Sequence, residues 1–213
     1  MNALGHKVLI LILAVTLTAA GQAAAMEYKN YGVVGVGASI PTGGLDDAGY
    51  DAGIATWVSY GRMLTDNLAI EAGGGFFYTD QDLEGNTSMA GYYTREDHVG
   101  VSYVSVTLKA VIPAGPVMLF AGGGIGGYYV SLDSDVETSA IGDFNVDDDD
   151  SAWGVHLVAG ASWDISSRFF VGGQGLYRWT DDIDIYKQVG SVPVRFSGDL
   201  DGYSLTIFGG FRF

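Results

Sequence analysis

Apolar and polar residues alternate along most of the chain beyond residue 30, as in strands whose two faces meet different surroundings. The end of the chain shows this most clearly: one face carries Tyr203, Leu205, Ile207, Gly209, Phe211 and Phe213, and the other carries Ser204, Thr206, Phe208, Gly210 and Arg212. The same alternation predicts eight strands, at residues 31–40, 53–64, 68–79, 98–112, 117–132, 152–165, 169–180 and 202–213. Each reaches the roughly 9–11 residues with which a tilted strand crosses a bilayer.

The links between these strands alternate in length. Those after the second, fourth and sixth strands are tight turns, whereas those after the first, third, fifth and seventh are long and rich in Asp, Gly and Ser. Transmembrane barrels have this arrangement, with short periplasmic turns and long external loops. Because a sheet edge in hydrocarbon leaves backbone N–H and C=O groups without partners, the sheet must close. The sequence therefore predicts an all-β fold, an eight-stranded antiparallel transmembrane β-barrel (an up-and-down meander) whose narrow interior is filled by side chains.

The final strand resembles the C-terminal signature of bacterial outer-membrane β-barrel proteins, in which apolar and polar residues alternate up to a terminal Phe. The residues that match this pattern are Tyr203, Leu205, Ile207, Phe211 and Phe213, while Gly209 stands where a larger apolar residue is usual. The resemblance implies that the barrel-assembly machinery reads these five residues as an assembly signal. The whole mature chain is similar to the small eight-stranded barrels of the OmpA/OmpX/OmpW-like, porin-like group. That likeness implies a place in the cell outer membrane, among its lipid and lipopolysaccharide.

The first 25 residues have the features of a signal peptide. His6 and Lys7 form its short basic start, the apolar segment 8–20 carries no charge, and residues 23–25 are three alanines of the size that a signal peptidase reads. We expect cleavage before Met26, which leaves residues 26–213 as one exported barrel domain. No later stretch reaches the roughly 18 continuous apolar residues of a membrane-spanning helix.

A barrel in a membrane turns its apolar faces to lipid, so we expect small and polar residues inside. The alternation places Trp153 and Trp163 on the lipid side of their strand, near opposite membrane interfaces. The polar and charged side chains that we expect in the interior are Arg62, Glu71, Lys109, Asp164, Gln174, Arg178 and Arg212.

The strand at 53–64 is ambiguous, because its two faces are similar in polarity. Placing Arg62 inside leaves Trp57 and Met63 facing lipid and puts Val58 and Tyr60 inside. We take this arrangement as the prediction, since a charge in a membrane protein is expected to face the interior.

Glu71 and Lys109 lie on neighbouring predicted strands, each about four residues from a short turn. A charge inside a membrane protein must be paired or hydrated. These residues could therefore line a polar conduit or gate, or they could form a salt-bridged plug that fills the barrel and fixes its register. The plug is favoured, because eight strands leave little room.

The formal net charge is −15, and the acidic residues are concentrated in the four long connectors. All of the 25 acidic residues except Glu27, Asp66, Glu71 and Asp164 lie there. This charge excludes nucleic acid as a partner, because a phosphate backbone requires a basic surface. The run Asp147, Asp148, Asp149 and Asp150 could bind a divalent cation weakly, although it lacks the ligand spacing of an EF-hand loop. A solvated acidic surface that bridges lipopolysaccharide phosphates through ambient cations is the favoured interpretation.

Few residues suggest catalysis. Cysteine is absent, and the glycine-rich segment 122–127 continues into a strand rather than the helix that a phosphate-binding loop needs, so no cofactor is predicted. The pairs His98 and Ser102, and His156 and Ser162, would stand about 13 and 20 Å apart along their strands, too far for a nucleophile and its base.

We therefore predict a non-catalytic outer-membrane barrel with a structural or surface-interaction role through its acidic external loops. The alternatives are a narrow porin-like channel for small or hydrophobic solutes, a secreted soluble lipid-binding barrel and, as a minor possibility, a lipid-A-modifying enzyme.

Overall fold

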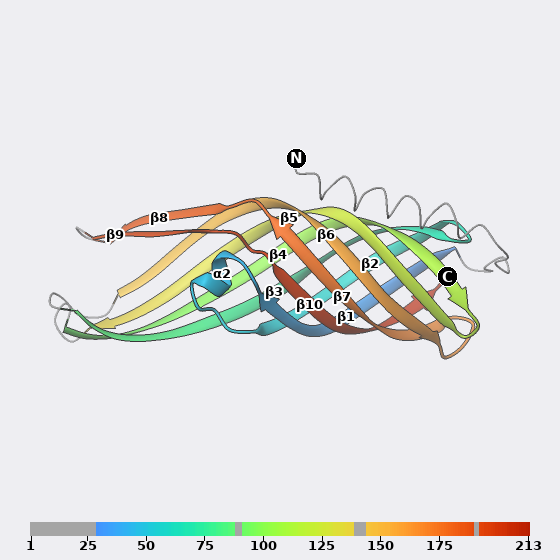
Figure 1. Cartoon of the computed structure of the whole chain (residues 1–213), viewed down its shortest axis with the longest axis horizontal. Coiled ribbons are helices and arrows are strands. Elements are labelled where there is room, and N and C mark those ends of the chain that lie inside the picture. Colours follow the sequence, from blue (N-terminus) through green and yellow to red (C-terminus); the bar gives the residue numbers. More distant parts are fainter. Residues whose placement is uncertain (1–28, 88–90, 139–143, 190–191) are drawn as a thin grey trace.

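The computed structural model describes residues 29–87, 91–138, 144–189 and 192–213. Eight strands form a closed barrel in the order β1-β10-β7-β6-β5-β4-β3-β2 (Figure 1). They are β1 (Asn30–Pro41), β2 (Gly53–Thr65), β3 (Leu68–Thr87), β4 (Gly91–Ala114), β5 (Val117–Thr138), β6 (Phe144–Asp164), β7 (Phe169–Thr180) and β10 (Gly202–Arg212). The hairpin of β8 (Ile183–Val189) and β9 (Val192–Gly198) is inserted between β7 and β10. The predicted eight-stranded antiparallel meander is confirmed.

The first and last barrel strands meet and close the sheet. β1 pairs with β10 from Tyr31 opposite Arg212 to Pro41 opposite Gly202. On its other side, β10 pairs with β7 from Gly202 opposite Arg178 to Phe211 opposite Phe169. Closure leaves no edge of unpaired backbone groups within the bilayer, where each such group would cost several kcal/mol.

The outer face of the barrel is apolar, as the alternation predicts. Val104 and Ile207 are 69% and 70% exposed, and Leu108 and Leu205 are also exposed. The interleaved positions Thr107 and Thr206 are buried. A water-soluble domain would have the reverse arrangement, with its aliphatic residues inside. In the described part of the chain, no helix is long and apolar enough to cross a membrane.

The second strand has the opposite phase to the one predicted. Val58 and Tyr60 are exposed on the outer face of β2, together with Arg62, while Trp57 and Met63 face inward. Arg62 is close to the turn that follows β2, and a base on the lipid face is tolerated near an interface, at a cost of about 0–1 kcal/mol. The free energy gained by turning the apolar Val58 and Tyr60 side chains to lipid outweighs the cost of exposing Arg62 there. The prediction that Arg62 lies inside is therefore wrong.

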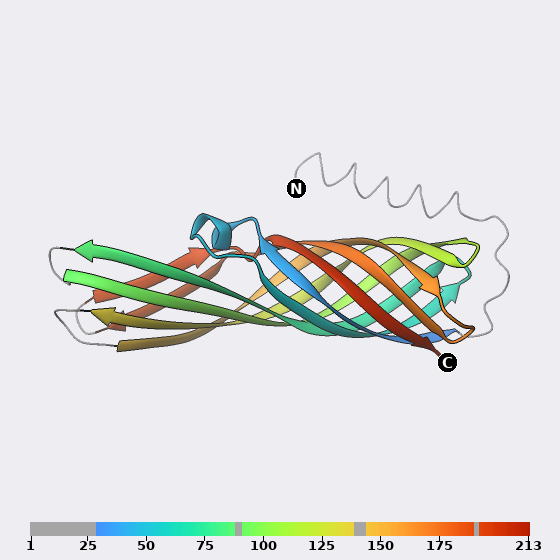
Figure 2. The ribbon, with the colours of Figure 1, turned by 90° about the horizontal axis from the view of Figure 1, so that it is seen from below.

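Four strands continue well beyond the predicted transmembrane segments. β3 runs to Thr87, β4 already begins at Gly91, β5 runs to Thr138, and β6 already begins at Phe144, where the sequence predicts loops. Backbone pairing continues to Thr87 opposite Gly91 and to Val136 opposite Phe144. Figure 2 shows these hairpins projecting from the end of the barrel opposite the C-terminus. Where both faces of a strand meet water the apolar alternation is lost, so these extensions are missed by pattern alone.

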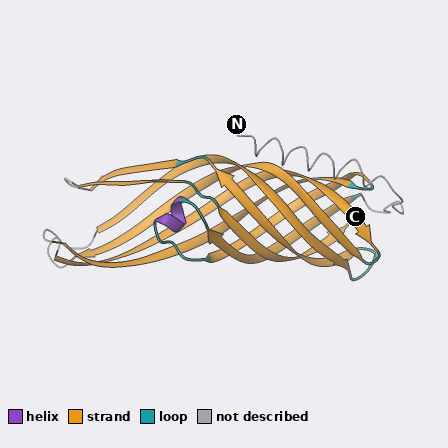
Figure 3. Cartoon of the chain, in the orientation of Figure 1, coloured by secondary structure: helices purple, strands orange, loops and turns teal. Residues whose placement is uncertain are grey.

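The mouth on the hairpin side is closed by side chains from the connecting segments. The short helix α2 (Gly44–Asp47), coloured purple in Figure 3, lies beside this mouth. Leu45 of α2, Ile183 of β8 and Leu200, which precedes β10, are fully or almost fully buried. They pack with inward residues of the wall, including Phe77 and Val101, in one apolar cluster.

Candidate functional site

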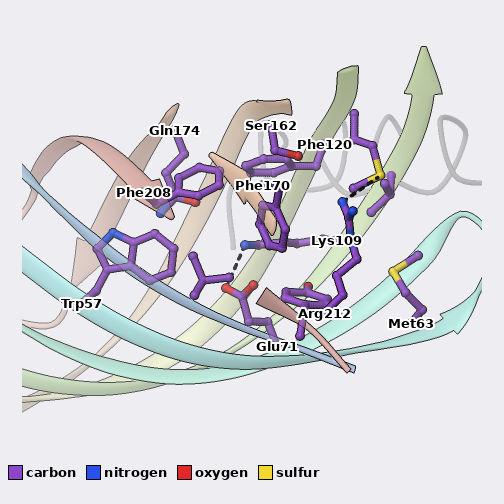
Figure 4. Close-up of a pocket in the computed structure, with 14 residues that line it drawn as sticks. Trp57, Met63, Glu71, Lys109, Phe120, Ser162, Phe170, Gln174, Phe208 and Arg212 are labelled. Atoms are coloured by element: carbon purple, nitrogen blue, oxygen red, sulfur yellow. Dashed lines mark hydrogen bonds and ion pairs between the residues drawn. The ribbon is translucent and has the colours of Figure 1, made fainter. Parts of the chain in front are cut away.

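The interior of the barrel contains the charged residues that the sequence singles out, except Arg62, and it forms the candidate site. Lys109 of β4 and Glu71 of β3 make an ion pair of 2.8 Å between Nζ and Oε1 (Figure 4). Their side chains are only 8% and 9% exposed. The Lys109 ammonium also lies 4.9 Å from the centre of the Phe120 ring and 6.0 Å from that of Trp57, within the range of a cation–π contact.

A second ion pair lies toward the end of the barrel that carries the short turns. Arg212 Nη2 of β10 donates to Asp164 Oδ1 at the end of β6 over 2.7 Å. The Arg212 guanidinium lies 4.6 Å from the centre of the Phe170 ring. Asp164 is partly exposed, so this pair is at the margin of the interior rather than in its middle.

Arg178 lies at the other end of the interior, below the closed mouth. It is 2% exposed and donates three hydrogen bonds: Nε to Leu200 O at 2.7 Å, Nη2 to Ser39 Oγ at 3.1 Å and Nη1 to Ser204 Oγ at 3.2 Å. Its guanidinium stacks 3.9 Å from the centre of the Phe77 ring. These contacts join β1, β7, β10 and the segment before β10, so Arg178 holds the mouth segments to the wall.

Between these layers the interior contains two adjoining cavities. The one toward the short turns has about 570 Å³ of space between atoms, which includes space open to solvent, and is lined largely by aromatic and aliphatic side chains (Figure 4). The other, of about 370 Å³, lies at mid-barrel. Trp57, Glu71, Lys109 and Gln174 line both, so the Glu71–Lys109 ion pair stands between them.

Several polar side chains line the mid-barrel cavity. Ser59 Oγ, His156 Nδ1 and Gln174 Oε1 are buried without a hydrogen-bond partner among the described residues, and all three residues line this cavity. The other nitrogen of His156, Nε2, lies 2.8 Å from Thr107 Oγ1. Buried polar atoms that share a cavity are the usual places for ordered water. We therefore expect water molecules at these three atoms.

The interior is more aromatic than the sequence suggests. Phe120, Phe170 and Phe208 pack inside with Trp57, whose Nε1 donates to Thr206 Oγ1 over 3.1 Å. A signal for these rings is present in the sequence, because several inward glycines lie beside them. A Cβ at Gly35 would overlap the Trp57 ring, one at Gly172 the Phe208 ring and one at Gly210 the Phe170 ring. The expectation of a small and polar interior is therefore wrong in this half of the barrel.

The acidic run has a different setting from the one predicted. Asp147, Asp148, Asp149 and Asp150 lie within β6 rather than in a loop, paired with residues 130–133 of β5. Successive side chains of a strand point to opposite faces, so Asp149 points to the other face from Asp148 and Asp150. Asp150 Oδ2 instead accepts a hydrogen bond from the Asp184 backbone N–H at 2.9 Å. In residues 29–87, 91–138, 144–189 and 192–213, no group of three or more acidic or histidine side chains is placed to hold a metal ion.

The C-terminal signature residues lie on the outer face of β10. Tyr203, Leu205, Ile207 and Phe213 are exposed and Phe211 is half-buried. The Phe211 ring lies 5.0 Å from that of Phe169 and 6.0 Å from that of Phe213. Their role as an assembly signal stays a prediction, as does cleavage of residues 1–25, which lie outside the described residues.

Both histidines of the described chain are engaged by hydroxyl groups other than the serines considered for catalysis. His98 Nδ1 lies 2.7 Å from Tyr78 Oη, and His156 Nε2 is bonded to Thr107. Neither arrangement joins a histidine to a serine nucleophile in the way that acyl transfer requires.

Comparison with known proteins agrees with this architecture. The family model of the outer membrane protein beta-barrel domain matches residues 10–213. Among solved structures, the chain is similar to the outer membrane protein OprG from Pseudomonas aeruginosa, with 15% identity, a TM-score of 0.59 and coverage of 87% of this chain and 96% of that one. It is also similar to a major outer membrane protein from Thermus thermophilus, with 12% identity, a TM-score of 0.58 and coverage of 88% and 100%.

Identities this low show a shared fold alone, and no curated protein matches the chain. The family model, in contrast, spans nearly the whole sequence and agrees with the closed barrel and its apolar outer face. The chain thus belongs to the outer membrane protein beta-barrel domain family and resides in the outer membrane.

Proposed function

We propose that this outer-membrane protein is a non-catalytic barrel that acts through the sheet and hairpins projecting from its mouth. The observation that carries the proposal is the contrast between its two halves. The wall formed by β3, β4, β5 and β6 continues as paired, acidic strands beyond the apolar belt, while the bore is occupied by side chains. Strands with fixed register hold a binding surface in place more rigidly than free loops do.

Three layers of side chains support the closed-bore part of the proposal. The apolar cluster around Leu45 fills the mouth, with the hydrogen-bonded Arg178 beneath it. The Glu71–Lys109 pair crosses the middle, and the Arg212–Asp164 pair lies toward the other end. The acidic extension favours partners that are basic or that carry phosphates bridged by divalent cations. We propose the phosphates of lipopolysaccharide as the partner, because they surround the barrel in its own membrane.

The test uses the protein in phospholipid nanodiscs and lipopolysaccharide as the probe, with and without calcium. In one variant, residues 82–96 and 134–147 are each replaced by a two-residue turn, which shortens both hairpins and leaves the barrel intact. We expect calcium-dependent binding by the full chain and at least tenfold weaker binding by the shortened chain. The double variant Glu71→Leu/Lys109→Met, which changes only the interior, serves as the control and should bind like the parent. Equal binding by the parent and the shortened chain would overturn the proposal.

The cavity of about 570 Å³ supports the channel as a second candidate, because it extends from the central ion pair toward the short turns. Planar-bilayer recordings separate the two functions. A plugged barrel gives no stable unit conductance, whereas steps that Lys109→Ala enlarges would favour a narrow channel controlled by the Glu71–Lys109 pair.

A further inference from the structure

Basic residues are distributed unevenly over the barrel. Lys109, Arg178 and Arg212 are buried inside. Among the described side chains, the exposed bases are Lys29, Arg62 and Arg168, and all lie at the end that carries the short turns. In an outer-membrane barrel this end faces the periplasm. Asp66, in the turn after β2, is the exposed acidic side chain of the described residues at this rim.

The exposed bases lie on one side of the rim, where the barrel closes. The Met63 N–H donates to Lys29 O at 2.8 Å, so Lys29, just before β1, lies opposite Met63 and one position along the rim from Arg62, which is opposite Asn30. Across β10, the Arg212 N–H donates to Arg168 O, also at 2.8 Å. Around the barrel the strands follow in the order β2, β1, β10 and β7. Arg62 lies on β2, Lys29 just before β1 and Arg168 in the turn before β7, so the three bases lie along one arc of the rim.

Arg62 has the most unusual setting of the three. It lies on the outer face of β2 between Tyr60 and Leu64, which are 49% and 51% exposed to the lipid side, and opposite Ile70 of β3. A guanidinium among lipid-facing apolar side chains extends along them to bring its charge to the headgroup layer. Its position near the strand end allows it to reach that layer on the periplasmic side.

An aromatic strip borders the same bases. The Tyr60 ring lies 6.2 Å from that of Phe213, which lies 6.0 Å from that of Phe211, which in turn lies 5.0 Å from that of Phe169. These four rings cross β2, β10 and β7 on the outer face of the barrel. The bases thus present positive charge at the level of the lipid headgroups. The rings present a continuous aromatic surface at the level of the acyl chains.

We propose that this surface binds an anionic phospholipid of the inner leaflet, with its phosphate held by Lys29 and Arg62 and its acyl chains along the rings of Tyr60, Phe213 and Phe211. The occupant is identified by charge. The chain carries a net charge of −15, and its exposed bases in the described barrel gather at this one rim. A base near an anionic lipid surface favours that surface about fivefold, so two bases predict a preference on the order of 25-fold for an anionic over a zwitterionic lipid. This site is independent of the hairpins at the opposite end.

The test measures how much lipid the detergent-purified full chain retains, by native mass spectrometry. The probes are phosphatidylglycerol and phosphatidylcholine with the same acyl chains. The variant Lys29→Gln/Arg62→Gln removes the two bases, and the control Lys187→Gln/Arg195→Gln removes two bases of the hairpin β8–β9 at the other end. Heat-modifiable migration of each protein on gels checks that the barrel has formed.

We expect the parent and the control to prefer phosphatidylglycerol on the order of 25-fold, and the Lys29→Gln/Arg62→Gln variant to lose this preference. Inorganic phosphate at the lipid concentration should not displace phosphatidylglycerol, because it lacks the acyl chains that contact the rings. Equal retention of the two lipids by the parent would overturn the proposal. A preference that survives in the Lys29→Gln/Arg62→Gln variant would also overturn it and would leave a periplasmic protein as the occupant of this rim.

Discussion

Replacing Lys109 with methionine tests whether the central ion pair is a structural plug. The side chains of Lys109 and Glu71 are 8% and 9% exposed, so the substitution leaves a carboxylate in a site with little access to water. Breaking a buried pair by removing one partner costs about 3–5 kcal/mol, because the remaining charge loses its compensation. Replacing both partners with apolar residues is often close to neutral. We therefore expect Lys109→Met to lower the free energy of unfolding by about 3–5 kcal/mol and Glu71→Leu/Lys109→Met to lie within about 1–2 kcal/mol of the parent.

The assay is equilibrium urea unfolding of the protein folded into phospholipid vesicles, followed by tryptophan fluorescence and by gel migration. With Glu71→Leu as the second single variant, a double-mutant cycle isolates the coupling between the two residues. Arg62→Gln is the control, since it removes an exposed base from the same region and should change the stability by less than about 0.5 kcal/mol. A coupling below about 1 kcal/mol would refute the reasoning, because it would mean that the pair does not plug the barrel.

Three further predictions concern packing, the mouth and assembly. Gly210→Ala should destabilise the barrel by about 1–3 kcal/mol in urea, because its Cβ would overlap the Phe170 ring, whereas Gly209→Ala, with nothing within 4 Å, should be nearly neutral. Arg178→Met removes three hydrogen bonds at the mouth, so hydrogen exchange of the segment 199–201 should become at least tenfold faster while the short turns keep their protection. Deleting Phe213 should lower the yield of barrel in the outer membrane without changing unfolding of the refolded protein; an equal yield would remove its role as an assembly signal.

Much of the interior could be predicted from the sequence, but not all of it. The alternation and the alternating connector lengths place Glu71 and Lys109 on adjacent strands, and the structure brings them into contact. The same reasoning was wrong for Arg62, because a rule that turns every charge inward ignores depth in the membrane. A base near a strand end can reach the headgroups, and then its apolar neighbours decide which face turns to lipid.

The extended hairpins and the closed mouth could not be predicted from the pattern of apolar residues, for another reason. Asp147 to Asp150 have no apolar alternation, because both faces of that part of β6 are polar, and only backbone pairing with β5 keeps the strand going. Leu45 becomes fully buried through contacts with residues far away in the sequence, which no local pattern records.

The sequence by itself determined that the chain is a closed barrel with an apolar exterior, since a two-residue period separates the faces of each strand whatever lies around it. It also determined where the turns fall and which end carries the acidic residues. Only the tertiary structure decided what fills the bore, because the residues that share a layer come from strands on opposite sides of the barrel. Aromatic rings seated over glycines, one pair of charges at mid-barrel and three bases gathered where β1 meets β10 all depend on strand register and closure, which alternation along single strands does not specify.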